Sequence, residues 1–113
     1  MLDRTIPFFN AILRCDEYEF QPVLLPNGYQ IVSYQPGFEK DWARLEYEIG
    51  DFDSEEEAEA YFNEQYLHKG WNDDILFLKD KSGMVIRSCI TWTDKRQDLP
   101  VHSLHWLIVN ENN

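Results

Sequence analysis

Two histidines near the end of the sequence, His102 and His105, are the side chains best suited to bind a metal ion or to move a proton. A spacing of three would bring them onto one face of a helix. The residues around them alternate as in a strand, however, and positions three apart in a strand point to opposite faces. We therefore expect no shared metal ion. His105 alone could accept a proton, or it could pack at the rim of the core.

A carboxylate is the second candidate for acid–base chemistry. Asp51 lies between two predicted helices, where it could act as a general base or could cap a helix. Cys89 lies in an apolar run typical of a strand, so we predict an inert core thiol rather than a nucleophile. Trp92 and Trp106 are expected in the core or in a pocket wall. The sequence contains no P-loop, GxGxxG, HExxH or GxSxG motif.

The elements that position these residues are predicted to form an α+β fold in the order β-α-α-β-β-β. Alternating apolar and polar residues predict the strands, and apolar residues three and four apart predict the helices. The predicted strands are 29–34, 74–79, 84–92 and 101–109, and the predicted helices are 38–49 and 54–67. Short connections should make the last three strands an antiparallel meander. The helices would cover this sheet within one domain, 1–113.

Local signals refine these elements. The pattern SxxE at 54–57 is a capping box that begins the second helix. In the last strand, Leu104, Trp106 and Ile108 are predicted to share one face. Residues 5–13 are predicted to form a short helix or turn that lies on the core. The predicted core consists of Trp42, Leu45, Ile49, Phe62, Phe77, Ile90 and Trp106.

The charge of the chain limits its partners. The 113 residues carry 21 Asp and Glu against 10 Lys and Arg, a net charge of −11, and residues 37–74 hold 13 of these acids and 3 of the bases. Nucleic acid and anionic membranes would be repelled, and no apolar run is long enough to span a bilayer. With no signal-peptide pattern and no CxxC pair, we expect reduced thiols in a cytoplasmic protein. From the charge alone, the chain could also be interpreted as an acidic mimic that occupies a basic surface of another molecule.

A larger pattern connects the predicted elements. In chain order, its segments are IPF (6–8), LPNGY (25–29), YQPGFEKDWA (34–43), DFDSEEEA (51–58) followed by Tyr61 and Phe62, the strand 86–92, and HWLIV (105–109). This ordered set covers nearly the whole chain. It resembles the N-terminal part of the GCN5-related N-acetyltransferases, in particular a bacterial subgroup that begins with a similar IPF segment.

The resemblance implies transfer of an acetyl group from acetyl-CoA to a primary amine on a small molecule or peptide. Backbone groups of Leu107, Ile108 and Val109 would pair with the pantetheine arm and polarise the thioester carbonyl. The helices over 38–67 would form one wall of the amine site, and their acidity suits a cationic amine. The general base is left open, with His105 and Asp51 as candidates.

Part of the family pattern is absent from these 113 residues. The Q/R-x-x-G-x-G/A loop, which opens the helix that holds the CoA pyrophosphate, has no counterpart. Arg87 and Ser88 stand where the subgroup has a Gly-Thr-like pair. The resemblance thus predicts a truncated domain that is weakly active or inactive alone. The alternative is a non-catalytic relative that binds a partner or forms a homodimer through the unpaired edge of 101–109.

Overall fold

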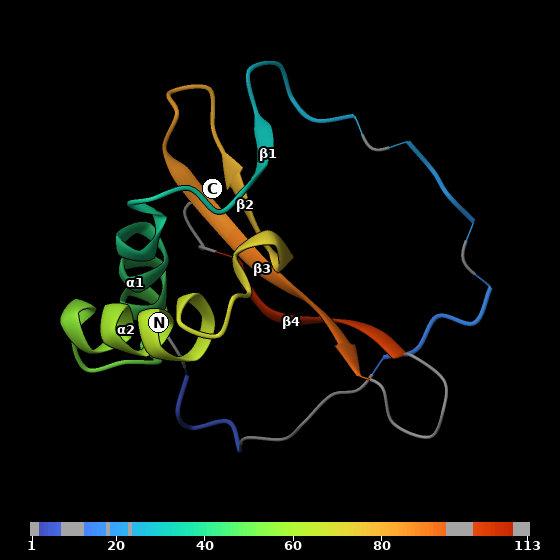
Figure 1. The fold of residues 1–113 in the computed structure, drawn as a ribbon. Coiled ribbons are helices and arrows are strands. Elements are labelled where there is room, and N and C mark those ends of the chain that lie inside the picture. The colour runs from blue at the N-terminus through green and yellow to red at the C-terminus, as the bar shows by residue number, and fades with distance from the viewer. Residues whose placement is uncertain (1–2, 8–12, 18, 23, 95–100, 110–113) are drawn as a thin grey trace.

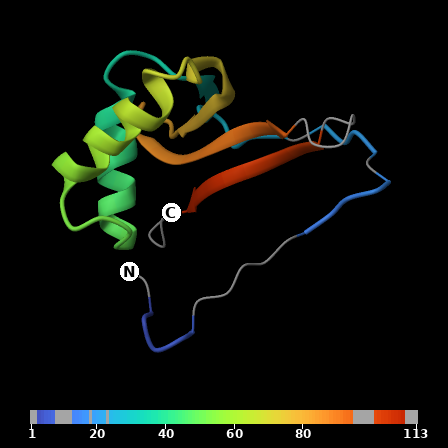
Figure 2. The same ribbon diagram turned by 60° about the horizontal axis from the view of Figure 1, so that its bottom comes forward.

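Four strands form one antiparallel sheet, and two helices pack together on one side of it in this computed structural model (Figures 1 and 2). The structure describes residues 3–7, 13–17, 19–22, 24–94 and 101–109. Within the strands, the residues described by their backbone alone are Thr93, Asp94, Val101, His105, Trp106 and Val109. Among the described residues, no helix has the length and apolar character needed to cross a membrane.

The elements follow the order β-α-α-β-β-β, which confirms the predicted α+β class. The strands are β1 (Gln30–Ser33), β2 (Ile75–Lys79), β3 (Val85–Asp94) and β4 (Val101–Val109). The helices are α1 (Phe38–Ile49) and α2 (Glu55–Phe62), followed by a π-helical turn (Asn63–Leu67) and a 3₁₀ turn (Asn72–Asp74). The sheet order is β1-β2-β3-β4, and every neighbouring pair is antiparallel. The last three strands form the predicted meander.

Glycines with left-handed backbone bound α1 at both ends. Gly37 precedes the helix with a φ of 102°, and Gly50 follows it with a φ of 88°. Glycine adopts this region with little strain, so both positions suit a helix boundary. The Gly50 NH donates to the carbonyls of Glu46 and Tyr47. The helix therefore has the predicted bounds, 38–49.

A side-chain cap begins α2 as predicted. The Ser54 hydroxyl oxygen accepts a hydrogen bond from the Glu57 NH at 3.1 Å, which satisfies one of the free donors of the first turn. Three glutamates, Glu55, Glu56 and Glu57, occupy this turn. Their charges are stabilised by the positive end of the helix dipole.

The predicted helix over 54–67 is confirmed in extent, but its second half is a π-helical turn rather than an α-helix. The α-helix ends at Phe62, and in the π-helical turn that follows, the His68 NH donates to the Asn63 carbonyl five residues back. Tyr66 lies in this turn and packs against Phe62 with ring centroids 5.5 Å apart. The aromatic packing stabilises a turn that is rare in regular helices.

The core lies between the helices and one face of the sheet. One row of paired residues crosses all four strands and consists of Val32, Phe77, Ser88 and Ile108. The predicted core residues that are buried in one cluster are Trp42, Leu45, Phe62, Phe77 and Ile90. Ile49 is partly buried against this cluster, and the side chain of Trp106 lies outside the described part of the chain.

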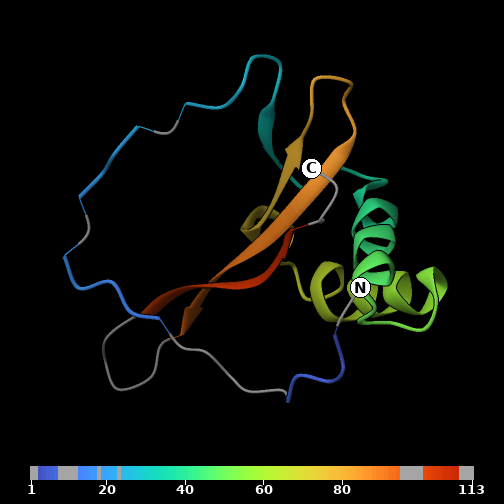
Figure 3. The ribbon, with the colours of Figure 1, turned by 180° about the vertical axis from the view of Figure 1, so that it is seen from behind.

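The N-terminal segment departs from its prediction. Thr5 donates its NH and its hydroxyl to the Asp3 carboxylate in a tight turn, and residues 8–12 lie outside the described part. Leu13 is 95% exposed, so the expectation that 5–13 lies on the core is wrong for this residue. The apolar faces of the helices and the sheet already cover each other, and the described N-terminal residues pass outside them (blue in Figure 3).

A hydrogen-bonded carboxylate joins the end of β1 to the start of α1. The Tyr34 hydroxyl donates to a Glu39 carboxylate oxygen at 2.7 Å, and the Gly37 NH donates to the same oxygen at 2.9 Å. Burial alone would raise the pKa of Glu39, but the hydrogen bonds outweigh it and hold the pKa below its usual value. Burial, and then the hydrogen bond to Glu39, raise the pKa of Tyr34 to about 12.

We expect Glu39→Gln to lower the melting temperature at neutral pH and to flatten its dependence on acid pH. A carboxylate with a lowered folded-state pKa stabilises the fold above its unfolded pKa, and this contribution is lost as the pH falls through the folded pKa. Thermal unfolding between neutral pH and about pH 3 measures the effect. Glu19→Gln, at an exposed residue outside the helices, is the matched control, and identical profiles for the Glu39 variant and the parent chain would contradict the expectation.

Candidate functional site

β4 lies at one side of the sheet, and among the described residues it pairs with β3 alone. Its outer edge therefore presents backbone NH and C=O groups that no described strand pairs. The strand contains no Asp, Glu, Lys, Arg or Pro. The three positions expected to hold the cofactor arm, Leu107, Ile108 and Val109, end this strand.

A β-bulge interrupts β4 between His105 and Ile108, so it includes Leu107. Ile90 pairs with His105 and Ser88 pairs with Ile108, so β4 has one residue more than β3 between the two pairs. An extra residue reverses the alternation of side chains beyond it. Leu104 is accordingly 67% exposed whereas Ile108 is 1% exposed, and the prediction that they share a face is wrong.

The structure places the two candidate acid–base residues on different elements. His105 lies in β4 opposite Ile90. Asp51 is exposed in the bend after α1, where its NH donates to the Glu46 carbonyl at 3.1 Å. Ser54, rather than Asp51, caps α2. Among the described residues, no group of three His, Cys, Asp or Glu could hold a metal ion.

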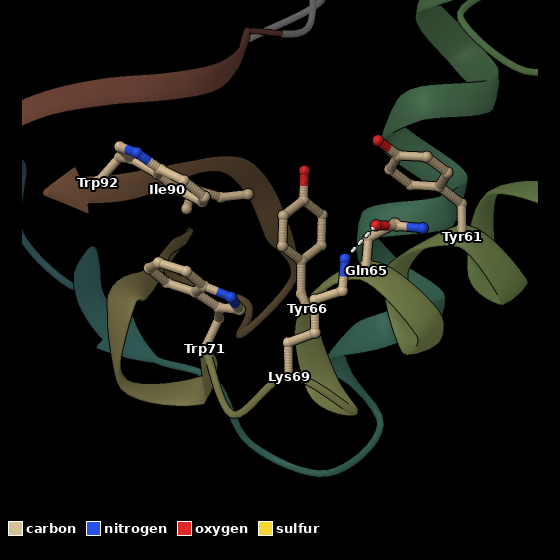
Figure 4. Close-up of a pocket in the computed structure, with 7 residues that line it drawn as sticks. All are labelled: Tyr61, Gln65, Tyr66, Lys69, Trp71, Ile90 and Trp92. Carbon is tan, nitrogen blue, oxygen red and sulfur yellow. Dashed lines mark hydrogen bonds between the residues drawn. The ribbon is translucent and has the colours of Figure 1, made fainter. Parts of the chain in front are cut away.

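A pocket of about 240 Å³ opens between the end of α2, the loop before β2, and β3. Figure 4 shows the side chains that surround it. Its aromatic walls are Tyr61, Tyr66, Trp71 and Trp92, and Ile90 adds an aliphatic surface. Two polar side chains complete the lining, and the Lys69 ammonium donates to the Gln65 carbonyl oxygen at 2.7 Å. The pocket is thus aromatic inside and carries one cation at its lining.

The aromatic rings form two pairs on either side of the pocket (Figure 4). Trp71 and Trp92 stack with centroids 4.3 Å apart and planes 12° apart. Tyr61 and Tyr66 meet edge to face at 6.1 Å. Behind them, Trp42 stacks parallel to Tyr61 at 6.3 Å. These contacts fix the orientation of the rings without any ligand.

A buried carboxylate lies behind the tyrosines. Glu46 on α1 is fully buried. Burial is the main cause that raises the pKa of the Tyr66 hydroxyl far above its usual value, and the neighbouring Tyr61 and Glu46 raise it further. Tyr66 therefore stays protonated at neutral pH and lines the pocket as a neutral phenol.

The two thiols differ in their surroundings. Cys15 is exposed, and Cys89 is half-buried in β3. Burial raises the pKa of the Cys89 thiol. The thiolate that a nucleophile needs is therefore disfavoured, in line with the predicted inert thiol.

Sequence reasoning placed Trp92 in the core or in a pocket wall but did not identify the pocket. Its other walls, Tyr61, Tyr66 and Trp71, lie within eleven residues around the end of α2. Such a density of aromatic residues at a helix end is the signal that could have found it. Their meeting with Trp92 depends on how the end of α2 and the loop before β2 pack against β3, which no local pattern encodes.

Comparison of the chain with protein-family models, with curated protein sequences and with solved structures finds no match.

Proposed function

We propose that this chain forms the N-terminal part of a GCN5-related N-acetyltransferase fold, in which acetyl-CoA donates an acetyl group to a primary amine. The observation that carries the proposal is the bulged strand β4, whose outer edge no described strand pairs, at the segment that resembles the family's HW-x-x-V strand. β-Bulges are frequent at sheet edges and beside active sites, where they redirect backbone groups. The acyl arm of the cofactor would lie along this edge.

The backbone of Leu107, Ile108 and Val109 supplies the groups for this role. A thioester carbonyl becomes more electrophilic when fixed NH donors stabilise the negative charge that develops on its oxygen. Backbone donors in a sheet are held by the neighbouring strand, so they need no rearrangement during the reaction. Ile108 is 1% exposed, and its buried side chain would anchor the edge at this point.

The described helix N-termini do not fit the diphosphate of acetyl-CoA. At the start of α1, the Gly37 NH already donates to the Glu39 carboxylate. At the start of α2, three glutamates surround a first turn whose Glu57 NH is taken by Ser54. At both ends, acidic side chains in the first turn offset the positive field that would attract a diphosphate. We therefore expect these 113 residues, with their net charge of −11, to bind acetyl-CoA weakly and to turn it over poorly.

A titration of the ¹⁵N-labelled chain with acetyl-CoA tests this proposal. We expect a dissociation constant weaker than about 1 mM, with amide shifts concentrated at Leu107, Ile108 and Val109. The amides of β1, at the opposite edge of the sheet, are the internal control. Shifts absent from 107–109 at saturating acetyl-CoA would contradict the family proposal. Micromolar binding with acetylation of an amine would contradict the expected weakness alone.

A non-catalytic, self-associating module is the second candidate. The observation that favours it is the composition of β4, because natural edge strands are usually protected by charges or proline and this one has neither. The exposed Leu104 and Leu107 add apolar surface to the same strand. Sedimentation analysis would then detect a dimer that Leu104→Lys dissociates, and acetyl-CoA would leave the spectrum of the chain unchanged.

A further inference from the structure

We propose that the pocket between Tyr66 and the Trp71–Trp92 pair binds a fully alkylated ammonium group, such as the trimethylammonium head of a small ligand. The pocket volume, about 240 Å³, is below the range of roughly 300–1,000 Å³ typical of sites for drug-sized ligands. It therefore suits a head group rather than an extended molecule. A fully alkylated nitrogen has no lone pair with which to attack a thioester, so this binding stands apart from the proposed acetyl transfer to an amine.

The electron-rich rings provide the attraction. Four of the lining residues are aromatic, and the stacked Trp71 and Trp92 present the largest π surface. A cation near the faces or edges of such rings is attracted to the negative charge of their π systems, most strongly for tryptophan. The rings are already locked by contacts with one another and with Trp42. Binding therefore requires little loss of side-chain freedom.

The acidity of the segment that forms most of the pocket favours a cation over an anion. Glu46 is fully buried behind Tyr66 and interacts with it electrostatically. Between Leu45 and Leu78 the sequence holds eleven Asp and Glu, and Lys69 is the one Lys or Arg. None of these acids lines the pocket, so their negative field acts at longer range: it favours a cation, whereas Lys69 attracts a carboxylate at close range.

The hydrogen-bonding groups of the pocket favour an alkylated ammonium over a primary one. A primary ammonium brings three N–H donors that must find acceptors when they leave water. Here the Gln65 carbonyl oxygen already accepts from Lys69, and no carboxylate lines the pocket to accept the other N–H groups. A trimethylammonium group has no N–H to satisfy, and its methyl groups match the aromatic walls.

Lys69 provides a test of whether the pocket prefers a positive or a negative ligand. Its exposed ammonium lines the pocket and is held toward the helix by Gln65. It repels a cationic ligand and attracts an anionic one. We expect Lys69→Gln to tighten the binding of a cation about two- to threefold, whereas an anion would bind more weakly to this variant.

Choline is the probe for calorimetry and for quenching of tryptophan fluorescence. The comparison ligands are its neutral isostere, in which a tert-butyl group replaces the trimethylammonium, and ethanolamine, its primary amine counterpart. We expect choline to bind about tenfold more tightly than either. Equal or tighter binding of the neutral isostere or of ethanolamine, or no binding of choline at all, would overturn the proposal.

Two tryptophan variants locate the site. Trp71→Leu and Trp92→Leu keep an apolar side chain but remove a π surface, and each should weaken choline binding about tenfold. Tyr47→Leu, an exposed aromatic residue on α1 that does not line the pocket, is the control and should change nothing. Circular dichroism checks that each variant folds. If a tryptophan variant does not fold, the change in choline binding of Lys69→Gln still decides the question. Tighter binding of benzoate than of choline would assign the pocket to an anion and overturn the proposal.

Discussion

Replacing Trp42 with alanine is expected to lower the free energy of unfolding by about 3–5 kcal/mol. Trp42 is fully buried where both helices meet the sheet. The rings around it, with centroids 5.1–6.3 Å away, are Phe52, Tyr61, Phe62 and Tyr66. Alanine would leave a cavity that these fixed rings cannot fill, because each is also packed against another. Urea denaturation followed by circular dichroism measures the loss.

Tyr47→Ala on the same helix is the matched control. Tyr47 is 48% exposed, so its removal should cost less than about 1 kcal/mol. A loss of less than about 1 kcal/mol for Trp42→Ala would place Trp42 outside the core and contradict the packing of α1. Because Trp42 supports Tyr61 from behind, its removal should also weaken choline binding by the pocket.

Ile108→Ala is expected to cost about 2–5 kcal/mol, and Leu107→Ala, one residue earlier, less than about 1 kcal/mol. Ile108 is buried beneath the helices, whereas Leu107 is 65% exposed. The contrast follows from the bulge, which sets the side-chain alternation at the end of β4. Denaturant titrations measure the unfolding free energies of the two variants, provided that both show the same slope of free energy against denaturant concentration.

Equal losses for the two variants, or a larger loss for Leu107→Ala, would contradict the register of β4. The two variants also distinguish the anchoring of the strand end by the Ile108 side chain from the binding of acetyl-CoA by the backbone. Leu107→Ala keeps the backbone donors of the edge, so the acetyl-CoA shifts at Ile108 and Val109 should persist in it. In Ile108→Ala a loosened strand end should reduce them, since the donors are no longer held in place.

The sequence predicts the bounds of α1 well because several signals agree there. Trp42, Leu45 and Ile49 form an apolar stripe, and Gly37 and Gly50 stop the helix on both sides. In β1, alternation likewise distinguishes the core-facing Val32 from the exposed Ile31. When period and boundary residues point to one structure, local physics alone determines the element.

The sequence does not predict features that depend on how elements meet. Strict alternation in 101–109 hides the bulge, because the extra residue is defined by the partner strand β3. The apolar pattern of 5–13 resembles a core segment, yet Leu13 is exposed because the core surface is already covered. The pocket combines Trp71 with Trp92, which only tertiary packing brings together.

The π-helical turn makes the aromatic pocket depend on chain length as well as on side chains. Its hydrogen bonds span five residues, so Asn63–Leu67 holds one residue more than an α-helical turn would need. Deleting Glu64 would leave four residues where the π-helical turn has five, as in an α-helical turn, and would change the position of Tyr66 relative to α2. A scan of substitutions would leave this dependence undetected. Among related chains, a single insertion or deletion within the turn would therefore distinguish those with the pocket from those without it.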